Sequence, residues 1–301
     1  MGASVAISTL HRGVARELWL DDSRAGLADA EALDLAHGAS FFPSCEVRRA
    51  GVEDMATGCD VIVIAAGKGA LPGVSRLDAL AVTAAVAHEL GARLRGARGV
   101  VVVVTNPVDV MTQLVMQSSG LPPERVIGTG TMLDTARLRH ELSVRTSIDR
   151  NSLHAYVLGE HGDSQVVAWS TAEVGGLPLR RLPQWRREDE PGIAEIVRRA
   201  AYEIIAGKGA TNHAIGLVTA SLLQCVLRDE RRVLTVSRVH EPGTLPTACF
   251  GTGRVALSLP TVVSREGAVT VLLPDLDEVE QQALMRSADV LRAAHAGVAA
   301  H

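Results

Sequence analysis

A histidine, an aspartate and an arginine in the second half of the chain could together move a proton to or from an anionic substrate. His161 lies between glycines in the motif GEHGDS, directly after an apolar run. Asp134 and Arg137, in LDTARLR, are three residues apart, which would place them on one face of a helix. A carboxylate beside a histidine fixes its tautomer and favours the imidazolium, and an arginine binds a carboxylate through two parallel hydrogen bonds. The alternatives are a structural histidine and a surface ion pair.

Two further polar residues follow apolar runs in the first half of the chain. Asn106, in VTNPVDV, could hydrogen-bond a carbonyl or hydroxyl of a ligand, or it could cap the following helix. Arg76 follows the glycine-rich stretch AAGKGALPGVS, which is typical either of a lid that carries one arginine or of a flexible crossover with a solvated arginine. In open α/β sheets the carboxyl ends of the strands form the ligand crevice, so both residues are candidates for a site there.

The elements that position these side chains are expected to include a parallel sheet. The runs DVIVIAAG and VVVVVT are continuous and β-branched, which is typical of parallel strands buried on both faces. The fold class is therefore α/β, with a Rossmann-type doubly wound sheet in a dinucleotide-binding domain over 1–128. The expected strands are 18–20, 46–49, 60–65, 100–105 and 126–127, and the expected helices are 4–11, 24–37, 77–94 and 110–118.

The pattern changes after residue 128, where strict alternation of strands and helices ends. We expect a helix that begins near Asp134, a long helical stretch over 193–228 interrupted at GKGATNHAIG, and a terminal helix over 275–296. Strands are expected around 232–239, 255–260 and 268–273. This mixture indicates an α+β substrate domain over 129–301.

The composition excludes several other classes of protein. The net charge of −4 offers no basic surface for nucleic acid, and aromatic residues, at 3%, are too few for base-stacking platforms. The apolar runs are too short to span a bilayer. The four cysteines are scattered singly, without the spacing of a metal site or a disulfide framework. We expect a cytoplasmic protein with no metal, no nucleic-acid partner and no membrane partner.

Taken in order, the motifs of this chain resemble the L-lactate/malate dehydrogenase family, and specifically its bacterial L-lactate dehydrogenase branch. Each motif is weak alone, but their order is specific, and the resemblance covers nearly the whole chain. The motifs are LWLDD, EALDLAHG, DVIVIAAG, PGVSRLD, VTNPVDV, RVIGTGTMLDTARLR, HAYVLGEHGDS and GKGATNHAIG.

The resemblance implies hydride transfer between NAD(H) and a 2-oxo/L-2-hydroxy acid, with a role for each candidate residue. It implies that His161 exchanges a proton with the substrate oxygen and that Asp134 orients this histidine. It implies that Arg137 binds the substrate carboxylate and that Arg76, on a closing loop, polarises the carbonyl. Asn106 would help to hold the substrate and the nicotinamide.

The resemblance also assigns residues to the cofactor and to the substrate pocket. Asp22 matches the acid that hydrogen-bonds the adenine ribose and repels a 2′-phosphate, which favours NAD over NADP. Thr211 and Ile215 match positions that line the pocket and pack on the nicotinamide ring. Gly2 matches the third glycine of a G-x-G-x-x-G motif, and Gly67 is assigned to the same cofactor site.

One position departs from the family pattern. Ala70 stands where glutamine suits lactate and where arginine suits the second carboxylate of malate. A buried dicarboxylate without its cation is strongly disfavoured, so the alternative of a malate dehydrogenase is opposed. The small side chain favours pyruvate or a bulkier 2-oxo acid.

The family also suggests an effector and an assembly. Arg139 and His154 match positions that bind fructose 1,6-bisphosphate between subunits of allosteric bacterial lactate dehydrogenases, although both could instead be solvated. Members of the family form homotetramers or homodimers, so we expect an oligomer here.

The first residues lack the first strand and the first two glycines of a dinucleotide-binding unit. The family pattern places that strand between those at 18–20 and 60–65, which would put it upstream of Met1 in an N-terminally truncated chain. The alternative is a degenerate paralogue that binds NAD weakly, which the five retained polar groups oppose: His161, Asp134, Arg137, Arg76 and Asn106.

Overall fold

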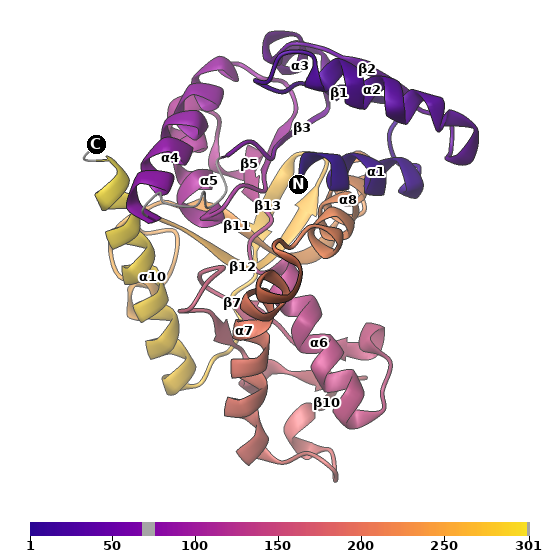
Figure 1. Ribbon diagram of the computed structural model, residues 1–301. Helices are drawn as coiled ribbons and strands as arrows, with labels where there is room; N and C mark the ends of the chain where they lie inside the picture. The colour runs from indigo at the N-terminus through magenta and orange to yellow at the C-terminus, as the bar shows by residue number, and fades with distance from the viewer. Residues whose placement is uncertain (68–75, 300–301) are drawn as a thin grey trace.

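A six-stranded sheet forms the centre of the computed structural model, which describes residues 1–67 and 76–299 (Figure 1). Its parallel part consists of β3 (Val61–Ile64), β4 (Val100–Val103) and β5 (Val126–Gly128). Three antiparallel strands from the second half extend it in the order β13-β12-β11-β5-β4-β3: β11 (Arg232–His240), β12 (Val255–Ser264) and β13 (Gly267–Val271). The α/β class is confirmed. The strands of the second half share this sheet, since Ser237 of β11 pairs with Gly128 of β5.

The valine run of β4 is buried on both faces, as its sequence predicts. Val101 and Val103 pack into a core that includes residues of α4 (Arg76–Arg93), α5 (Val108–Ser119) and α10 (Glu278–Ala299). Val100 and Val102 pack on the other face, against α1 (Gly2–Arg12) and α8 (His213–Leu227). All four valines are at most 2% exposed. Figure 1 shows α1 and α8 side by side on one face and α4, α5 and α10 on the other.

A second, two-stranded parallel sheet lies at one end of the molecule. It pairs β1 (Glu17–Leu20) with β2 (Glu46–Arg49), next to α2 (Leu27–His37) and the short helix α3 (Val52–Gly58), which the sequence patterns did not predict. Among the described residues no strand lies between β1 and β3. The strand that the family pattern places there stays a prediction.

The remaining part of the chain carries its own apolar core. Residues of α6 (Met132–Thr146), β7 (Val157–Leu158), β8 (Val166–Val167) and α7 (Glu190–Lys208) contribute to it. The long helical stretch is interrupted where predicted, because α7 ends at Lys208 before Gly209, whose φ is +83°. The other elements here are short: β6 (Leu153–His154), β9 (Glu173–Val174), β10 (Leu177–Pro178) and α9 (Thr247–Phe250).

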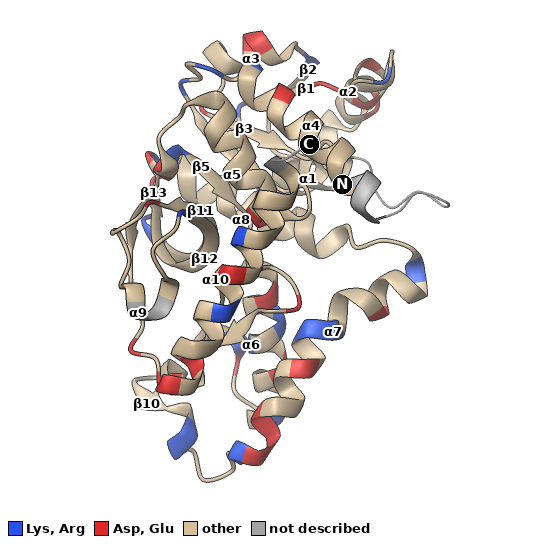
Figure 2. Ribbon diagram, turned by 90° about the vertical axis from the view of Figure 1, so that its left-hand side faces the viewer, with Lys and Arg blue, Asp and Glu red and all other residues tan. Residues whose placement is uncertain are grey.

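The surface of the molecule mixes charges of both signs. Figure 2 shows acidic and basic residues interspersed along α7 and α10. Within the described ranges no helix is both long and apolar enough to cross a membrane. The same residues contain no group of three potential metal ligands from His, Cys, Asp and Glu.

Candidate active site

The structure brings together His161, Asp134 and Arg137 at the start of α6. Oδ2 of Asp134 lies 2.5 Å from Nδ1 of His161, and Oδ1 of the same carboxylate accepts a 2.7 Å hydrogen bond from Arg137. The Asp134 side chain is buried, whereas the imidazole remains 23% exposed. Because Nδ1 is engaged by the carboxylate, Nε2 is the nitrogen left for a ligand.

Attraction between opposite charges dominates the electrostatics of this cluster. Burial alone would raise the pKa of Asp134, but the charges of His161 and Arg137 and their hydrogen bonds outweigh it, and the pKa is lowered. Burial alone would lower the pKa of His161, but the Asp134 charge and hydrogen bond, helped by Asp109, outweigh both burial and the repulsion from Arg137, and the pKa is raised. The pair therefore favours an ionised aspartate and a charged imidazolium.

Thr131, the N-cap residue of α6, and Thr135 within it connect the helix that carries Asp134 to the strand that leads to His161. The hydroxyl of Thr131 donates to the carbonyl of Val157 at 2.5 Å, and the hydroxyl of Thr135 accepts from the N–H of the same residue at 3.0 Å. Both backbone groups of Val157, the first residue of β7, are thus bound by these two threonines. The contacts attach the start of β7 to the beginning of α6.

The backbone turns sharply between β7 and His161. Gly159 has φ of +83°, and a Cβ there would lie 2.6 Å from the hydroxyl of Ser287 on α10. Its N–H and C=O both pair with Ser258 of β12 at 2.9 Å. Only glycine fits this combination of left-handed backbone and close approach, which explains the first glycine of GEHGDS.

The structure adds a residue that the sequence reasoning did not single out. Asp109, in the first turn of α5, accepts a 2.8 Å hydrogen bond from the backbone N–H of His161. Its position in VTNPVDV, three residues after Asn106, is consistent with an ordinary helix-start acid, so the sequence held no signal for a contact 52 residues away.

Asn106 follows β4 at the carboxyl edge of the sheet and is exposed. It does not cap α5, because Pro107 is the N-cap residue and no side-chain cap is formed. Among the described side chains it makes no hydrogen bond that would occupy its amide. Arg76 is the first residue of α4, but its side chain, like all of Ala70, lies outside what the structure describes.

The predicted cofactor residues lie around the same edge of the sheet. The N-terminus of α1 has no side-chain cap and no acid in its first turn, and a Cβ on Gly2 would lie 4.0 Å from Ala65, just after β3. Gly67 is packed so closely that a Cβ would lie 2.6 Å from Thr105. A bare helix N-terminus at a sheet edge suits a phosphate, so these residues fit the pyrophosphate of a dinucleotide.

Asp22 lies two residues after the end of β1, and its side chain is 35% exposed. Its Oδ1 accepts from the backbone N–H of Arg24 at 2.9 Å and from the guanidinium of the same residue at 3.3 Å. The backbone hydrogen bond lowers the pKa of Asp22 and outweighs its slight burial, with further help from the Arg24 side chain. The carboxylate is therefore ionised and suited to ribose hydroxyls.

Thr211 and Ile215 lie on either side of the start of α8, and both are half-buried. Ile215 packs against the core on the α1 face of the sheet. A Cβ on Gly216 would lie 2.5 Å from the carbonyl of Ser4, so α8 crosses α1 very closely. This crossing holds the start of α8, with the two predicted pocket residues, against α1.

Arg139 and His154 lie on neighbouring elements away from His161. The Arg139 guanidinium stacks over the ring of Tyr156 at 5.2 Å and donates to the carbonyl of Ala155 at 3.2 Å. His154, on β6, is exposed. The structure thus places Arg139 against the two residues that follow His154 in the chain.

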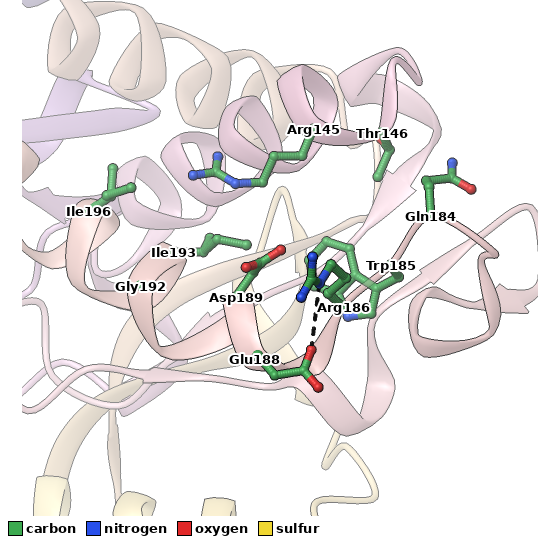
Figure 3. Close-up of a pocket in the computed structure, with 10 residues that line it drawn as sticks. All are labelled: Arg145, Thr146, Gln184, Trp185, Arg186, Glu188, Asp189, Gly192, Ile193 and Ile196. Atoms are coloured by element: carbon green, nitrogen blue, oxygen red, sulfur yellow. Dashed lines mark ion pairs between the residues drawn. The ribbon is translucent and has the colours of Figure 1, made fainter.

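A cavity of about 430 Å³ opens at the far end of α6 (Figure 3). Arg145 and Asp189 on its walls mix charges of opposite sign, and none of the residues predicted to act on substrate or cofactor lines it. It is therefore separate from the candidate active site. Its lining residues are Arg145, Thr146, Gln184, Trp185, Arg186, Glu188, Asp189, Gly192, Ile193 and Ile196.

A sheet with helices on both faces, a bare helix N-terminus at its carboxyl edge and a carboxylate-paired histidine beside that edge define a dinucleotide-dependent oxidoreductase. Comparison with family models agrees, since residues 1–128 match the NAD binding domain of lactate/malate dehydrogenase and residues 131–301 match its alpha/beta C-terminal domain. The chain belongs to the lactate/malate dehydrogenase family.

Its similarity to named relatives extends over nearly the whole chain. It is 43% identical to an L-lactate dehydrogenase of Thermus aquaticus (98% of this chain, 95% of the relative) and 39% identical to one of Kosmotoga olearia (98% and 92%). A solved minor L-lactate dehydrogenase of Enterococcus mundtii superposes with a TM-score of 0.92 at 34% identity, covering 99% of this chain and 95% of that one. The chain is an NAD-dependent enzyme of the L-lactate dehydrogenase type.

Proposed function

We propose that this enzyme reduces a 2-oxo acid to an L-2-hydroxy acid, reversibly, with His161 as the proton donor and acceptor. The observation that carries the proposal is the 2.5 Å contact between Nδ1 of His161 and the buried carboxylate of Asp134. NAD(H), when bound, supplies or accepts the hydride at the substrate carbon. The chain itself supplies the proton, the charge that binds the substrate and the orientation of both.

Proton transfer follows from the protonation states in the cluster. In reduction, Nε2–H of the imidazolium gives its proton to the substrate oxygen while the carbonyl carbon receives the hydride, which leaves a neutral histidine with its remaining proton on Nδ1. Asp134 stays ionised throughout and holds that Nδ1–H at 2.5 Å. In oxidation the neutral Nε2 takes the hydroxyl proton as hydride leaves the carbon, so the two directions need opposite states of one residue.

Arg137 is proposed to bind the substrate carboxylate. One of its terminal nitrogens is bound to Asp134 at 2.7 Å, which orients the guanidinium and leaves its other N–H groups for the ligand. Asn106 and Thr211 are proposed to orient the substrate, and Arg76 is proposed to polarise its carbonyl from the start of α4.

The substrate side chain is proposed to be that of pyruvate or of a bulkier 2-oxo acid, because Ala70 supplies neither an amide nor a cation. The test is steady-state reduction of pyruvate, 2-oxoisocaproate, phenylpyruvate and oxaloacetate with NADH. We expect the branched and aromatic acids to rival pyruvate and oxaloacetate to be poor. A large advantage of pyruvate over both bulky acids would overturn the bulkier-substrate proposal, and a preference for oxaloacetate would support a malate dehydrogenase.

The cofactor residues carry a second test. Asp22, Gly2, Gly67 and Ile215 are proposed to contact NAD, with Asp22 on the adenine ribose. NADH binding followed by fluorescence distinguishes an active enzyme from a degenerate paralogue. Tight binding with turnover is expected, and weak binding without turnover would support the paralogue.

We also infer that the protein assembles with copies of itself into a homodimer or homotetramer. Large apolar side chains are exposed on α2 and α8, with Leu33 and Leu217 each 58% exposed. Between these helices and α1 lies a hollow of about 540 Å³, lined by Ala3, Ser4, Ile7, Ser8, Glu31, Asp34, Leu35, His213 and Leu217. Light scattering after size-exclusion chromatography tests this, and a monomer at micromolar concentration would contradict it.

Arg139 and His154 support a proposal that fructose 1,6-bisphosphate regulates the enzyme. The stacking of Arg139 on Tyr156 orients a cation beside the strand of His154, and an anion with two phosphates would bind both. The effector should raise apparent affinity for the oxo acid, and unchanged kinetics and assembly would count against the site.

The free thiols of Cys45, Cys59 and Cys225 support the proposed cytoplasmic location.

A further inference from the structure

We propose that Asp109 is a positioning residue for His161: it holds the backbone of the histidine in place and supplies a second negative charge beside it. The inference rests on the role proposed above for His161 in proton transfer. Asp109 does not need to touch the substrate, because it acts through the histidine.

The geometry of the contact is that of a buried charge-assisted hydrogen bond. Oδ2 of Asp109 accepts from the N–H of His161 at 2.8 Å, and Asp109 is 2% exposed. The loop around His161 belongs to no helix or strand, so this N–H has no partner in a regular ladder. A buried N–H left without an acceptor is costly, and Asp109 removes that cost at the residue whose placement matters for catalysis.

The surroundings of the Asp109 carboxylate supply few other groups that stabilise its negative charge. Oδ1 of Asp109 is buried and makes no hydrogen bond of ordinary geometry, although the Ser237 hydroxyl faces the carboxylate. Burial raises the pKa of Asp109 to about 6, against the lowering effects of Ser237, of the His161 N–H and of the imidazolium charge, and with a small further rise from Glu160. The cation that stabilises ionised Asp109 is therefore His161 itself.

Three charged side chains act on the imidazole of His161. Asp134 acts on the ring, Asp109 acts from the backbone side, and Arg137 opposes both. Two carboxylates outweigh one guanidinium, so the imidazolium is favoured. Loss of the Asp109 charge should lower the pKa of His161 without breaking the contact between the ring and Asp134.

Asp109 lies close in the chain to Asn106, another predicted site residue. Asn106, proposed to orient the substrate, precedes Asp109 by three residues in the turn from β4 into α5. One short segment therefore carries both the Asn106 amide and the carboxylate that binds the backbone of His161.

Gln113, four residues later on α5, offers a matched structural control. Its side-chain oxygen accepts a 3.2 Å hydrogen bond from the backbone N–H of Ala256, and it is also buried. Gln113→Met removes a buried side-chain-to-backbone hydrogen bond from the same helix, but away from His161. Its effect reports the general cost of such a loss to the fold.

The experiment compares Asp109→Asn, Asp109→Ala and Gln113→Met in the full chain with NADH. Asparagine keeps an acceptor for the His161 N–H but loses the charge. We expect kcat for oxo-acid reduction at neutral pH to fall about three- to tenfold in Asp109→Asn with KM little changed, and further in Asp109→Ala. The fall of kcat/KM with rising pH should move to lower pH in Asp109→Asn and stay in place in Gln113→Met.

A readout independent of catalysis separates this inference from the role of His161. The imidazole titration of His161 is followed by NMR, with the signal assigned by its loss in His161→Gln. If the titration moves to lower pH in Asp109→Asn and the kinetic profile moves with it, the proposal stands. If only the titration moves, the proposed role of His161 is wrong while the coupling between Asp109 and His161 holds. An unmoved titration, with kinetics equal to those of Gln113→Met, overturns the inference.

Discussion

Asp134→Asn is the substitution that most directly tests the proposed proton transfer. The carboxylate is buried and makes two charge-assisted contacts, at 2.5 Å to His161 and at 2.7 Å to Arg137. Asparagine has nearly the same shape, so the fold should persist while the negative charge is lost. The imidazolium then has one neighbouring negative charge fewer.

The magnitude follows from the nature of the lost contact. A hydrogen bond to a charged group contributes about 1.5–3 kcal/mol, against about 0.5–1.5 kcal/mol for a neutral one. Loss of the charge should therefore cost about 1–2 kcal/mol at His161, or roughly five- to thirtyfold in the oxo-acid reduction rate at neutral pH. Arg137, deprived of its orienting partner, should also bind substrate less well, so KM should rise.

The pH dependence of the rate has a definite sign. Reduction needs the imidazolium, so kcat/KM for the oxo acid is high below the pKa of His161 and falls above it. The charge of Asp134 raises that pKa after outweighing burial, so Asp134→Asn should move the fall to lower pH. Oxidation of the hydroxy acid needs the neutral histidine, and its rise with pH should move in the same direction.

The same pair makes stability depend on pH. The lowered pKa of Asp134 contributes stability that is present above its unfolded pKa and is lost as pH falls through the folded pKa. The raised pKa of His161 contributes stability that is present below its unfolded pKa and is lost as pH rises through the folded pKa. Urea unfolding across both windows should show both slopes in the parent and weaker ones in Asp134→Asn.

Glu141→Gln, on the same helix, is the control for loss of a carboxylate. Glu141 forms an i,i+4 pair with Arg145 at 2.5 Å near the surface, and such pairs contribute about 0.2–0.5 kcal/mol. Its kcat/KM profile should match that of the parent. A profile in Asp134→Asn that also matches the parent would refute the reasoning, since the carboxylate would then have no part in the protonation of His161.

Three further outcomes follow from the geometry. Arg137→Lys should raise KM for the oxo acid about 10- to 100-fold with a smaller change in kcat, because a point charge replaces a planar fork; steady-state kinetics would contradict this if kcat alone fell. Asp22→Ser should narrow the preference for NADH over NADPH, because it removes the carboxylate that repels a 2′-phosphate. It also releases the Arg24 guanidinium, which lies 3.3 Å from Asp22. An unchanged ratio of kcat/KM for the two cofactors would exclude Asp22 from the ribose site. Thr135→Val should lower the free energy of unfolding by about 1–3 kcal/mol, because the N–H of Val157 loses its acceptor at 3.0 Å; equal stability in urea would show that the helix and strand do not depend on this contact.

Many helices and strands could be predicted from the sequence, because the pattern of apolar residues and the turn residues within each segment strongly favour one local structure. The valine run of β4 predicts a strand buried on both faces, and the structure confirms this. The first helix is predicted over 4–11, and it ends at Arg12 before Gly13, which lies in the left-handed conformation. The short helix over Val52–Gly58 was missed, because an apolar face so short gives little periodicity to detect.

The sequence by itself also determined the types and the local spacing of the reactive side chains. Asp134 and Arg137 meet because they are three residues apart on a helix, a distance that the helix repeat sets. The contact of Asp134 with His161 spans 27 residues, and residue types together with the family resemblance indicated it. The roles of these groups stay predictions until the substitutions are made.

Only the tertiary structure decided the contacts that depend on packing between distant segments. It paired β11 with β5, bound Val157 to two threonines at the beginning of α6, and placed Asp109 on the backbone of His161. A backbone N–H has no side-chain identity, so no residue pattern reveals which acceptor it will find. The physical reason is that such partners are chosen by the path of the whole chain, where buried polar groups must be satisfied by whatever folding brings beside them.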